Sequence, residues 1–303
     1  PEEVFQLVPG AGDVGAMITS DPRLAGVAFT GSTDTAHAIN RSLAARDGPI
    51  ATFIAETGGQ NAMIVDSSAL PEQVARDVVG SAFQSAGQRC SALRMLYLQD
   101  DVADHMLAMI IGAFEALEIG DPAILATDVG PVIDQDAKAA LDRHVARRRK
   151  AGHPVWQREL PAGPDTLIPR GCFVAPTIIE LGSILDLKRE NFGPVLHVAR
   201  YRADQLGQVI DDINTTGYGL TLGLHSRIDA VRRFVESRAR VGNFYVNRNQ
   251  IGAVVESQPF GGEGLSGTGP KAGGPHYVAR FATERVVCID TTAAGGNASL
   301  LAG

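Results

Sequence analysis

Short apolar segments and segments with helical spacing alternate along the chain from its first residues. Residues 4–8, 24–29 and 51–55 are apolar runs typical of buried strands, and residues 12–20 and 32–45 between them have the spacing of helices. The order strand, helix, strand, helix, strand is the half-unit of a doubly wound parallel sheet. The sequence therefore predicts an α/β protein that begins with part of a Rossmann-type domain.

The alternation continues through a second and longer α/β unit, residues 59–248. Its strands are expected at residues 61–65, 94–98, 178–180, 194–201, 218–225 and 242–246. Its helices are expected at residues 70–85, 102–117, 135–150, 206–214 and 229–238. The Pro/Gly-rich segment 151–171 is expected to form a surface excursion. A Gly/Ser-rich loop region, 249–284, and a last apolar strand, 285–289, complete the predicted fold.

The composition excludes several classes of function. The 303 residues are 45% hydrophobic and 20% charged, which is typical of a globular protein with a large core. The net charge of −7 gives no reason to expect binding to nucleic acid or to an anionic membrane. No apolar run approaches the ~20 residues that cross a bilayer, and we find no signal peptide. Because Pro1 is not an initiator methionine and one half-unit is short for a nucleotide domain, we expect a longer polypeptide.

The three cysteines, Cys90, Cys172 and Cys288, are too far apart in the sequence to form a zinc motif, and no metal site is predicted. They are interpreted as reduced thiols of a cytoplasmic protein. Cys172 and Cys288 have apolar neighbours and are expected to be buried and inert. Cys90 follows Gly87-Gln-Arg89, a poor core environment, and the Arg89 cation is expected to lower the pKa of its thiol. Cys90 is therefore the candidate nucleophile.

Glu56 follows the third predicted strand and precedes Gly58 and Gly59. Glycines at this place would let the backbone approach a ligand closely, and Glu56 is the candidate general base. Taken alone, the same residue would also fit a carboxylate at the edge of a sheet.

Two glycine turns could hold a phosphate group. Gly10-Ala-Gly-Asp-Val-Gly15 has the spacing of a dinucleotide-binding turn, but no acidic residue ends the next strand, and a tight turn explains these glycines equally well. Gly31 and Ser32 are the stronger candidates, because a glycine followed by a helix-capping serine presents free N–H groups and a hydroxyl to an anion. An ordinary helix cap is the alternative.

The order of the motifs is more informative than any one of them. Seven motifs follow one another along the chain: Phe29-Thr-Gly-Ser32, Glu56-Thr-Gly-Gly59, Gly87-Gln-Arg-Cys90, Glu190-Asn-Phe-Gly-Pro194, Tyr218-Gly-Leu220, Gly242-Asn243 and Pro259-Phe-Gly-Gly262. Over nearly the whole chain this series resembles the aldehyde dehydrogenase superfamily. The resemblance implies an aldehyde dehydrogenase-like fold.

The resemblance also implies a division of the chain and a cofactor. Residues 1–58 would be the C-terminal part of the NAD-binding domain, residues 59–248 the catalytic domain, residues 249–284 a substrate-anchoring region, and residues 285–303 an oligomerisation strand and tail. NAD is the implied cofactor. Its contacts would come from five residues: Gly31, Ser32, Gly58, Glu190 and Phe192. The pyrophosphate would lie at the Gly31–Ser32 turn, the nicotinamide ribose at Glu190 and the nicotinamide ring beside Phe192.

The implied reaction uses Cys90 as the nucleophile toward an aldehyde and Glu56 as the base that activates water to release an acid. The family's asparagine that helps to stabilise the oxyanion belongs to a motif that precedes residue 1. Glu263 is a departure, because many members carry Lys or Arg at this place.

The loops around the site resemble those of Δ1-pyrroline-5-carboxylate dehydrogenases, which oxidise L-glutamate γ-semialdehyde to glutamate in proline catabolism. The resemblance is strongest to the bifunctional proline utilization A enzymes, so a proline dehydrogenase domain is expected upstream in the same polypeptide. Ser91, Gly252, Ala253 and Phe260 are the implied contacts of this small-molecule substrate. Another semialdehyde dehydrogenase and a non-catalytic assembly module are the alternatives. Since family members pair a C-terminal strand across a dimer, a homodimer or higher oligomer is expected.

Overall fold

The computed structural model describes the whole chain except residues 1, 163–167, 169–170, 255 and 291–303. Seven α-helices are present in the described part: α1 Gly12–Ser20, α2 Thr33–Ala44, α3 Pro71–Phe83, α4 Asp100–Glu115, α5 Gln135–Lys150, α6 Leu206–Thr215 and α7 Asp229–Arg238. The strands are β1 Gly26–Thr30, β2 Thr52–Glu56, β3 Ala62–Val65, β4 Met95–Gln99, β5 Val155–Gln157, β6 Thr177–Glu180, β7 Val195–Tyr201, β8 Tyr218–Gly219, β9 Thr221–His225, β10 Asn243–Val246 and β11 Glu263–Gly264. None of the described helices is long and apolar enough to cross a membrane.

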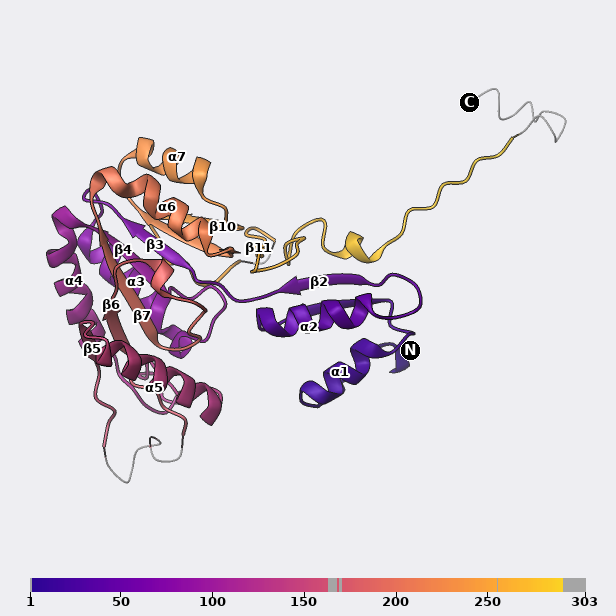
Figure 1. Cartoon of the computed structure of the whole chain (residues 1–303), viewed down its shortest axis with the longest axis horizontal. Helices are drawn as coiled ribbons and strands as arrows, with labels where there is room; N and C mark the ends of the chain where they lie inside the picture. Colours follow the sequence, from indigo (N-terminus) through magenta and orange to yellow (C-terminus); the bar gives the residue numbers. More distant parts are fainter. Residues whose placement is uncertain (1, 163–167, 169–170, 255, 291–303) are drawn as a thin grey trace.

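A seven-stranded sheet organises the larger lobe, with strand order β10-β9-β3-β4-β7-β6-β5 (Figure 1). All neighbouring pairs are parallel except β5 with β6. Helices α3 and α4 pack against each other and contact β7, and α6 packs beside α7. Every residue of β3, β4 and β9 is buried, as expected for parallel strands whose two faces are both covered. This confirms the predicted α/β fold class.

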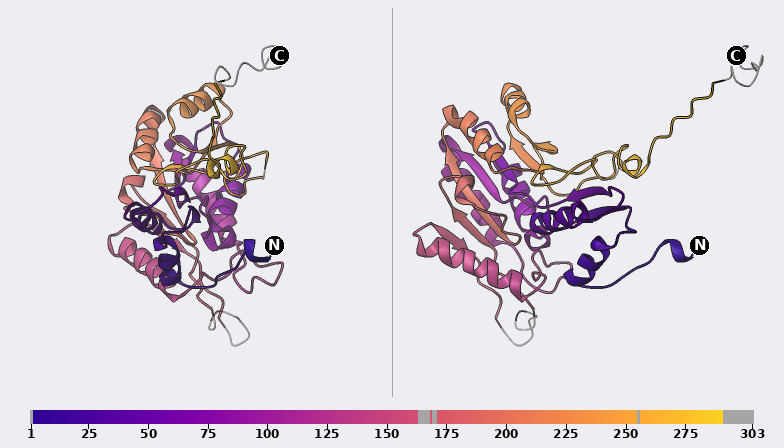
Figure 2. Two further views of the ribbon diagram at one scale, coloured as in Figure 1. Left: turned by 90° about the vertical axis from the view of Figure 1, so that its right-hand side faces the viewer. Right: turned by 45° about the vertical axis from the view of Figure 1, so that its right-hand side comes forward.

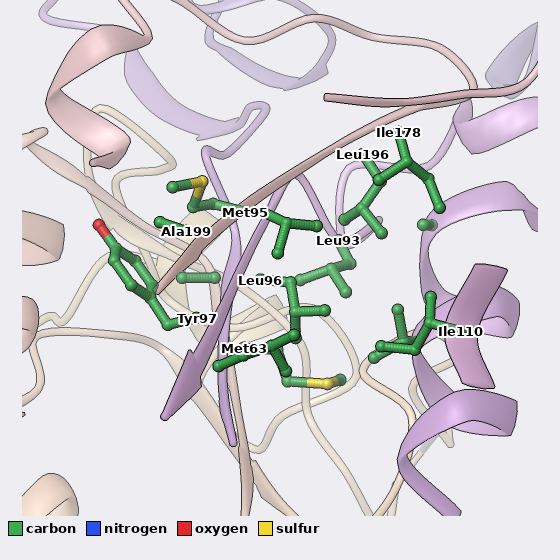
Figure 3. Packing of buried hydrophobic residues seen from close by; sticks show 14 of the residues in the cluster. Met63, Leu93, Met95, Leu96, Tyr97, Ile110, Ile178, Leu196 and Ala199 are labelled. Carbon is green, nitrogen blue, oxygen red and sulfur yellow. The ribbon is translucent and has the colours of Figure 1, made fainter. Parts of the chain in front are cut away.

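The core of this lobe is a continuous apolar cluster around β3 and β4 (Figure 3). Met63, Met95 and Leu96 from the central strands are fully buried, and Ile110 from α4 packs on the same cluster. Burying such a side chain contributes ~1.5–3 kcal/mol, so this lobe holds most of the apolar stabilisation of the described chain.

The smaller lobe contains β1 and β2, which form a two-stranded parallel sheet with Thr30 opposite Glu56. The prediction of a strand at residues 4–8 is wrong. Residues Glu2–Val4 form a short 3₁₀ helix, and Phe5 and Leu7 are exposed. No neighbouring strand pairs with this segment, and an apolar run without a partner leaves its backbone hydrogen-bonding groups to water.

Three further expectations need correction. The run 218–225 is divided at Leu220, because Gly219 pairs with Glu263 in β11 while β9 begins at Thr221 in the large sheet. The predicted excursion 151–171 contains β5, an edge strand that pairs with β6. Residues 285–289 form no strand in this single chain and run away from both lobes (Figure 1).

The other helices and strands agree with the sequence to within about two residues at each end, a common uncertainty of helix and strand limits. Helices α1, α5 and α7 have the predicted limits. Ser32 caps α2 as expected, since its hydroxyl accepts a hydrogen bond from the backbone N–H of Thr35 at 3.1 Å. The boundaries proposed for the four parts of the chain remain a prediction.

A loop near the C-terminus joins the two lobes. The backbone N–H of Thr57 donates to the carbonyl of Ser266, and that of Thr268 donates to the carbonyl of Ala55, each at 3.0 Å. The late segment therefore runs beside β2 and occupies its free edge (Figure 2). The small sheet is held in place by a segment about 210 residues later in the chain.

Candidate active site

A cleft of about 1230 Å³ lies between the two lobes. It is lined by every residue that the sequence predicts for the site: Gly31, Ser32, Glu56, Gly58, Cys90, Ser91, Glu190, Phe192, Gly252, Ala253 and Phe260. The segment Gly10–Gly15 does not line it, and Gly12 begins an exposed helix. Of the two candidate phosphate turns, only Gly31–Ser32 faces the cleft.

The two walls of the cleft are formed at different ends of their strands. Glu56 closes β2 at its carboxyl end, whereas Cys90 lies in the segment that leads into the amino end of β4. Residues at the amino ends of β3 and β9 surround the cysteine loop, because Asn61 bonds to both Cys90 and Thr221. The candidate base and the candidate nucleophile therefore line the same cleft from segments that belong to two different sheets.

The loop before Cys90 has an unusual backbone. Helix α3 ends at Phe83, and Ser85, Ala86 and Gly87 all have positive φ angles of 56°, 53° and 63°. Non-glycine residues adopt positive φ angles at some energetic cost, and residues with such strained backbones cluster at functional sites. At Gly87 a side chain is impossible, because a Cβ atom would lie 2.2 Å from the carbonyl oxygen of Gly193.

The side chain of Asn61 holds the cysteine loop through hydrogen bonds to its backbone. Its amide donates to the carbonyl oxygens of Cys90 at 2.6 Å and Ala92 at 2.9 Å, and its Oδ1 accepts from the N–H of Thr221 at 3.2 Å. Because this side chain is buried, the loss of its hydrogen bonds would lower the stability of the fold. Sequence reasoning missed Asn61. The available signal was an asparagine directly before the apolar run of a predicted strand.

The environment of Cys90 differs from the expectation. Burial raises the pKa of the Cys90 thiol above its ordinary value, and the carboxylates of Glu190 and Glu56 add to the rise. The backbone N–H of Ser91 opposes it only in part. Arg89 instead bonds through Nε to Ser85 Oγ at 3.0 Å. The predicted lowering by Arg89 is wrong, because a solvated guanidinium does not outweigh desolvation of the thiolate.

All three cysteines are free thiols, as expected. Cys172 is half-buried, whereas Cys288 is exposed, so its expected burial is wrong. The described residues contain no group of His, Cys, Asp and Glu that could hold a metal ion.

Glu56 is a half-buried residue whose two carboxyl oxygens are themselves buried and accept no hydrogen bond of normal geometry. Burial raises its pKa to about 7, while the backbone N–H of Gly262 and the charge of Lys271 oppose the rise. A carboxyl that titrates near neutrality can take up a proton and release it under working conditions. A Cβ atom on Gly261 would lie 2.6 Å from Glu56 Oε1, so that position leaves no room for a side chain beside the carboxyl.

Lys271 is the cation whose charge lowers the pKa of Glu56, and sequence reasoning missed it. Its ammonium group donates to the carbonyl oxygen of Gly242 and to Asn243 Oδ1. Burial lowers the pKa of Lys271, while Glu56 and Glu263 partly offset that effect. Lys271 lies within the Gly/Ser-rich loop region, and only the tertiary fold brings it near Glu56 at the end of β2.

The cleft fits a dinucleotide at its glycine-rich end. A Cβ atom at Gly58 would lie 1.8 Å from Glu190 Oε2, so a side chain at this position would displace the Glu190 carboxyl. At Gly31 a Cβ atom would meet the Phe29 ring at 2.4 Å. The start of α2 at Ser32 supplies the free N–H groups and the positive dipole end that suit a phosphate. The residues expected to hold NAD are thus compatible with it.

Glu190 is paired, unlike Glu56. Its Oε1 atom accepts from Arg94 Nη2 at 3.1 Å, and the Arg94 guanidinium also lies 5.2 Å from the centre of the Phe192 ring. Burial raises the pKa of the Glu190 carboxyl, and Arg94 opposes the rise. Sequence reasoning missed the role of Arg94. A lone charge at the start of an apolar strand was the signal.

The predicted substrate contacts line the same cleft. Gly252 has φ +79°, a conformation that favours glycine, and the nearby N–H groups of Gly252 and Ala253 suit a carboxylate. Ser91 is buried and belongs to the same lining. Phe260 is fixed by two backbone hydrogen bonds with Ala272, at 2.9 and 2.8 Å. The fold brings all four together from two loops.

The sequence profile of the aldehyde dehydrogenase family matches residues 1–287. The chain belongs to this family. It is 56% identical over 290 residues to the bifunctional protein PutA of Escherichia coli (strain K12), covering 94% of this chain and 22% of PutA. It is 36% identical over 285 residues to the 1-pyrroline-5-carboxylate dehydrogenase of Geobacillus kaustophilus, covering 92% of this chain and 54% of that enzyme.

Solved structures give the same relationship for this aldehyde dehydrogenase chain. A crystal structure of bifunctional proline utilization A superposes with a TM-score of 0.90 at 59% identity, covering 97% of this chain and 30% of that one. The 1-pyrroline-5-carboxylate dehydrogenase from Thermus with bound NAD has a TM-score of 0.81 at 32% identity, covering 90% of this chain and 52% of that one. The chain thus spans between about a fifth and a half of the length of these relatives.

Proposed function

We propose that this chain carries the active-site thiol of an enzyme that oxidises L-glutamate γ-semialdehyde to L-glutamate with NAD⁺. The observation that carries the proposal is the convergence of Cys90, Glu56 and the Ser91–Gly252–Ala253 donors on one cleft. The similarity to PutA and to 1-pyrroline-5-carboxylate dehydrogenases supports the choice of substrate. This would be the second oxidation step in proline catabolism.

The first chemical step forms a bond between Cys90 Sγ and the aldehyde carbon. Because burial favours the neutral thiol, a base must take its proton, and Glu56 has a suitable pKa of about 7 on the facing wall. The Cys90 backbone N–H would donate to the oxygen that becomes negatively charged; losing one such donor typically costs about 10²–10³ in rate. The product is a thiohemiacetal.

Oxidation of the thiohemiacetal removes a hydride and leaves a thioester on Cys90. NAD⁺, when bound, supplies the hydride acceptor. Gly31 and Ser32 would hold the pyrophosphate, Gly58 would permit close approach, and Glu190 with Phe192 would orient the nicotinamide ribose and ring.

Hydrolysis of the thioester completes the reaction. Glu56 would first release the thiol proton to solvent and then take a proton from a water molecule. The water oxygen attacks the thioester carbon and the bond to Sγ breaks, which releases glutamate and the Cys90 thiolate. General base catalysis of this kind typically contributes 10²–10⁴ in rate. Both oxygens of Glu56 are buried and lack a hydrogen-bond partner of normal geometry, so no donor of the described chain would compete with the proton from water.

The substrate also carries a carboxylate that needs donors. Ser91 Oγ and the N–H groups of Gly252 and Ala253 would supply three hydrogen bonds, and Phe260 would pack on the methylene groups. Hydrogen bonds to a charged group contribute about 1.5–3 kcal/mol each, so these contacts would distinguish this substrate from an uncharged aldehyde.

The finer properties of the intact protein are part of the same proposal. We expect a cytoplasmic homodimer or higher oligomer with a proline dehydrogenase domain earlier in the polypeptide. Val286, Val287 and Ile289 are exposed in this single chain, and a partner subunit would cover them by strand pairing. Deleting residues 285–303 is then expected to give monomers or aggregates in light scattering, and a stable, fully active monomer would contradict this.

The Ser91→Ala variant of the full-length protein tests the substrate assignment. Its KM for glutamate semialdehyde is expected to rise about tenfold or more, because 1.4 kcal/mol corresponds to one decade. The KM for an uncharged aldehyde of similar length is the internal control and is expected to change little. Ala253→Pro removes a backbone donor and is expected to have the same selectivity. Equal weakening of both aldehydes would leave an aldehyde dehydrogenase with another substrate.

A further inference from the structure

Arg94 is a charged side chain in the interior of the larger lobe. It is 1% exposed and stands immediately before the fully buried strand β4. Removing a guanidinium from water is costly unless its donors are satisfied, so a buried arginine indicates a specific network. Desolvation lowers the pKa of Arg94, and the contact with Glu190 opposes that change.

The guanidinium joins two loops that are almost 100 residues apart in sequence. Nη1 donates to the carbonyl oxygens of Gly87 at 2.7 Å and Gly193 at 3.2 Å. Nη2 donates to the carbonyl oxygen of Arg89 at 3.1 Å and to Glu190 Oε1 at 3.1 Å, and Nε reaches the same oxygen at 3.3 Å. One loop leads into Cys90, and the other contains the predicted cofactor contacts.

The two loops touch each other at this point. A Cβ atom on Gly87 would come within 2.2 Å of the Gly193 carbonyl oxygen, so the backbones are in van der Waals contact. The Arg94 guanidinium also lies 5.2 Å from the centre of the Phe192 ring, and Phe192 is 44% exposed. It holds Glu190 by Oε1 and leaves Oε2 on the side that faces Gly58.

We propose that Arg94 is a positioning residue that couples the cysteine loop to the cofactor-contacting loop. By holding Glu190 and Phe192 together with the carbonyls of Gly87 and Arg89, it fixes the distance between the thiol of Cys90 and the nicotinamide end of the cofactor. This inference rests on the proposed binding of NAD⁺ at Glu190. Arg94 itself touches no reacting atom.

A lysine cannot replace this arginine. The network uses three nitrogen atoms in a planar arrangement that spans both loops, and a lysine ammonium at one point cannot reach four acceptors in these directions. Arg94→Lys keeps the charge and most of the volume. It therefore separates positioning from electrostatics.

The experiment compares Arg94→Lys with the unmodified full-length protein in two equilibrium or chemical measurements. The Kd for NAD⁺ is expected to rise tenfold or more. The rate at which iodoacetamide alkylates Cys90 without NAD⁺ is expected to change at least threefold. Ile110→Ala is the matched control, because Ile110 is fully buried in the same core and contributes nothing to the cleft lining. It is expected to lower Tm with neither of the other effects.

A second comparison tests the route through Glu190. In a Glu190→Gln background, Arg94→Lys is expected to weaken NAD⁺ binding less than threefold, because the contact that it disturbs is already altered. Glu190→Asp keeps the charge but shortens the reach to Arg94, and it is expected to change Cys90 alkylation at least threefold without touching the cysteine loop. This variant decides the proposal if Arg94→Lys does not fold.

Three outcomes overturn the proposal: NAD⁺ affinity within threefold of the unmodified protein, an Ile110→Ala variant of equal Tm with equal loss of NAD⁺ affinity, or Cys90 alkylation that neither Arg94→Lys nor Glu190→Asp changes. The alkylation measurement needs neither substrate nor cofactor. If the unmodified protein does not bind NAD⁺, the proposed function fails, while alkylation still decides whether Arg94 couples the two loops.

Discussion

The two walls of the cleft are built differently. On the wall of the larger lobe, Cys90 and Glu190 are fixed by buried side chains, Asn61 and Arg94, beside a sheet whose central strands are wholly buried. On the wall of the smaller lobe, Glu56 ends a two-stranded sheet whose residues are mostly half-exposed, and its oxygens accept no hydrogen bond of normal geometry from the described residues.

This difference separates two tasks. A nucleophile must be held within a fraction of an ångström of its target, so a rigid and densely bonded wall suits it. A general base must accept and release a proton, so an unpaired carboxyl with a raised pKa suits it. The second wall gains its position from the late loop rather than from a core of its own. Variants on each wall are expected to separate the two tasks.

Removing the nucleophile is expected to have the largest effect. Cys90→Ala and Cys90→Ser in the full-length protein should have no measurable dehydrogenase turnover, because no thioester can form. The Kd for NAD⁺ should stay within about twofold, since Cys90 is not among the expected cofactor contacts. Substantial turnover in Cys90→Ala would show that Cys90 is not the nucleophile. Cys172→Ala is the control thiol and should retain activity.

Altering the base is expected to slow turnover by about 10²–10⁴. Glu56→Gln should affect thioester hydrolysis more than its formation, so a pre-steady-state burst of NADH should appear or grow in stopped-flow absorbance. An unchanged steady-state rate would show that Glu56 is not the base.

The pH dependence follows from the raised pKa of Glu56. The base acts when deprotonated, so kcat should rise with pH, pass its midpoint near the pKa of about 7 and then level off. Acidification should therefore remove activity before the fold is lost. Glu56→Gln should abolish this limb, and a profile that keeps the same limb in Glu56→Gln would assign it to another group.

Core substitutions should affect the stability of the two lobes unequally. Leu96→Ala, in the fully buried β4, should lower the free energy of unfolding by about 2–5 kcal/mol through lost burial and a cavity. Val27→Ala, in the half-exposed β1, should cost about 1 kcal/mol. Denaturant unfolding of the full-length protein measures both. Equal costs would break the comparison and indicate that another part of the polypeptide covers β1.

The smallest effect concerns the loop that holds the second wall. The Thr268 hydroxyl accepts from the backbone N–H of Ala55 at 2.9 Å, and Thr268→Val removes this acceptor at nearly constant volume. We expect a loss of about 1 kcal/mol. Because Ala55 precedes Glu56, kcat should fall while the alkylation rate of Cys90 stays unchanged. A change in Cys90 alkylation instead would mean that the two walls are not independent.

Much of the fold could be predicted from periodicity. Helix α7 has a polar and an apolar face and begins and ends as expected, and α5 also has the expected limits. The segment 4–8 has strand-like composition but no strand partner in the described structure, and composition cannot supply one. The interruption at Leu220 depends on Glu263, about 40 residues away, which pairs with Gly219. Pairings between distant segments are not encoded in a local pattern.

The sequence by itself determined the family and the residues that line the cleft, because ordered motifs carry that information without coordinates. Only the tertiary structure decided their chemical state. The raised pKa of Cys90 and the buried contacts of Arg94 arise where segments from different strands exclude water and bring charges together. Desolvation and Coulomb interactions depend on distance in space, and distance along the chain does not define them.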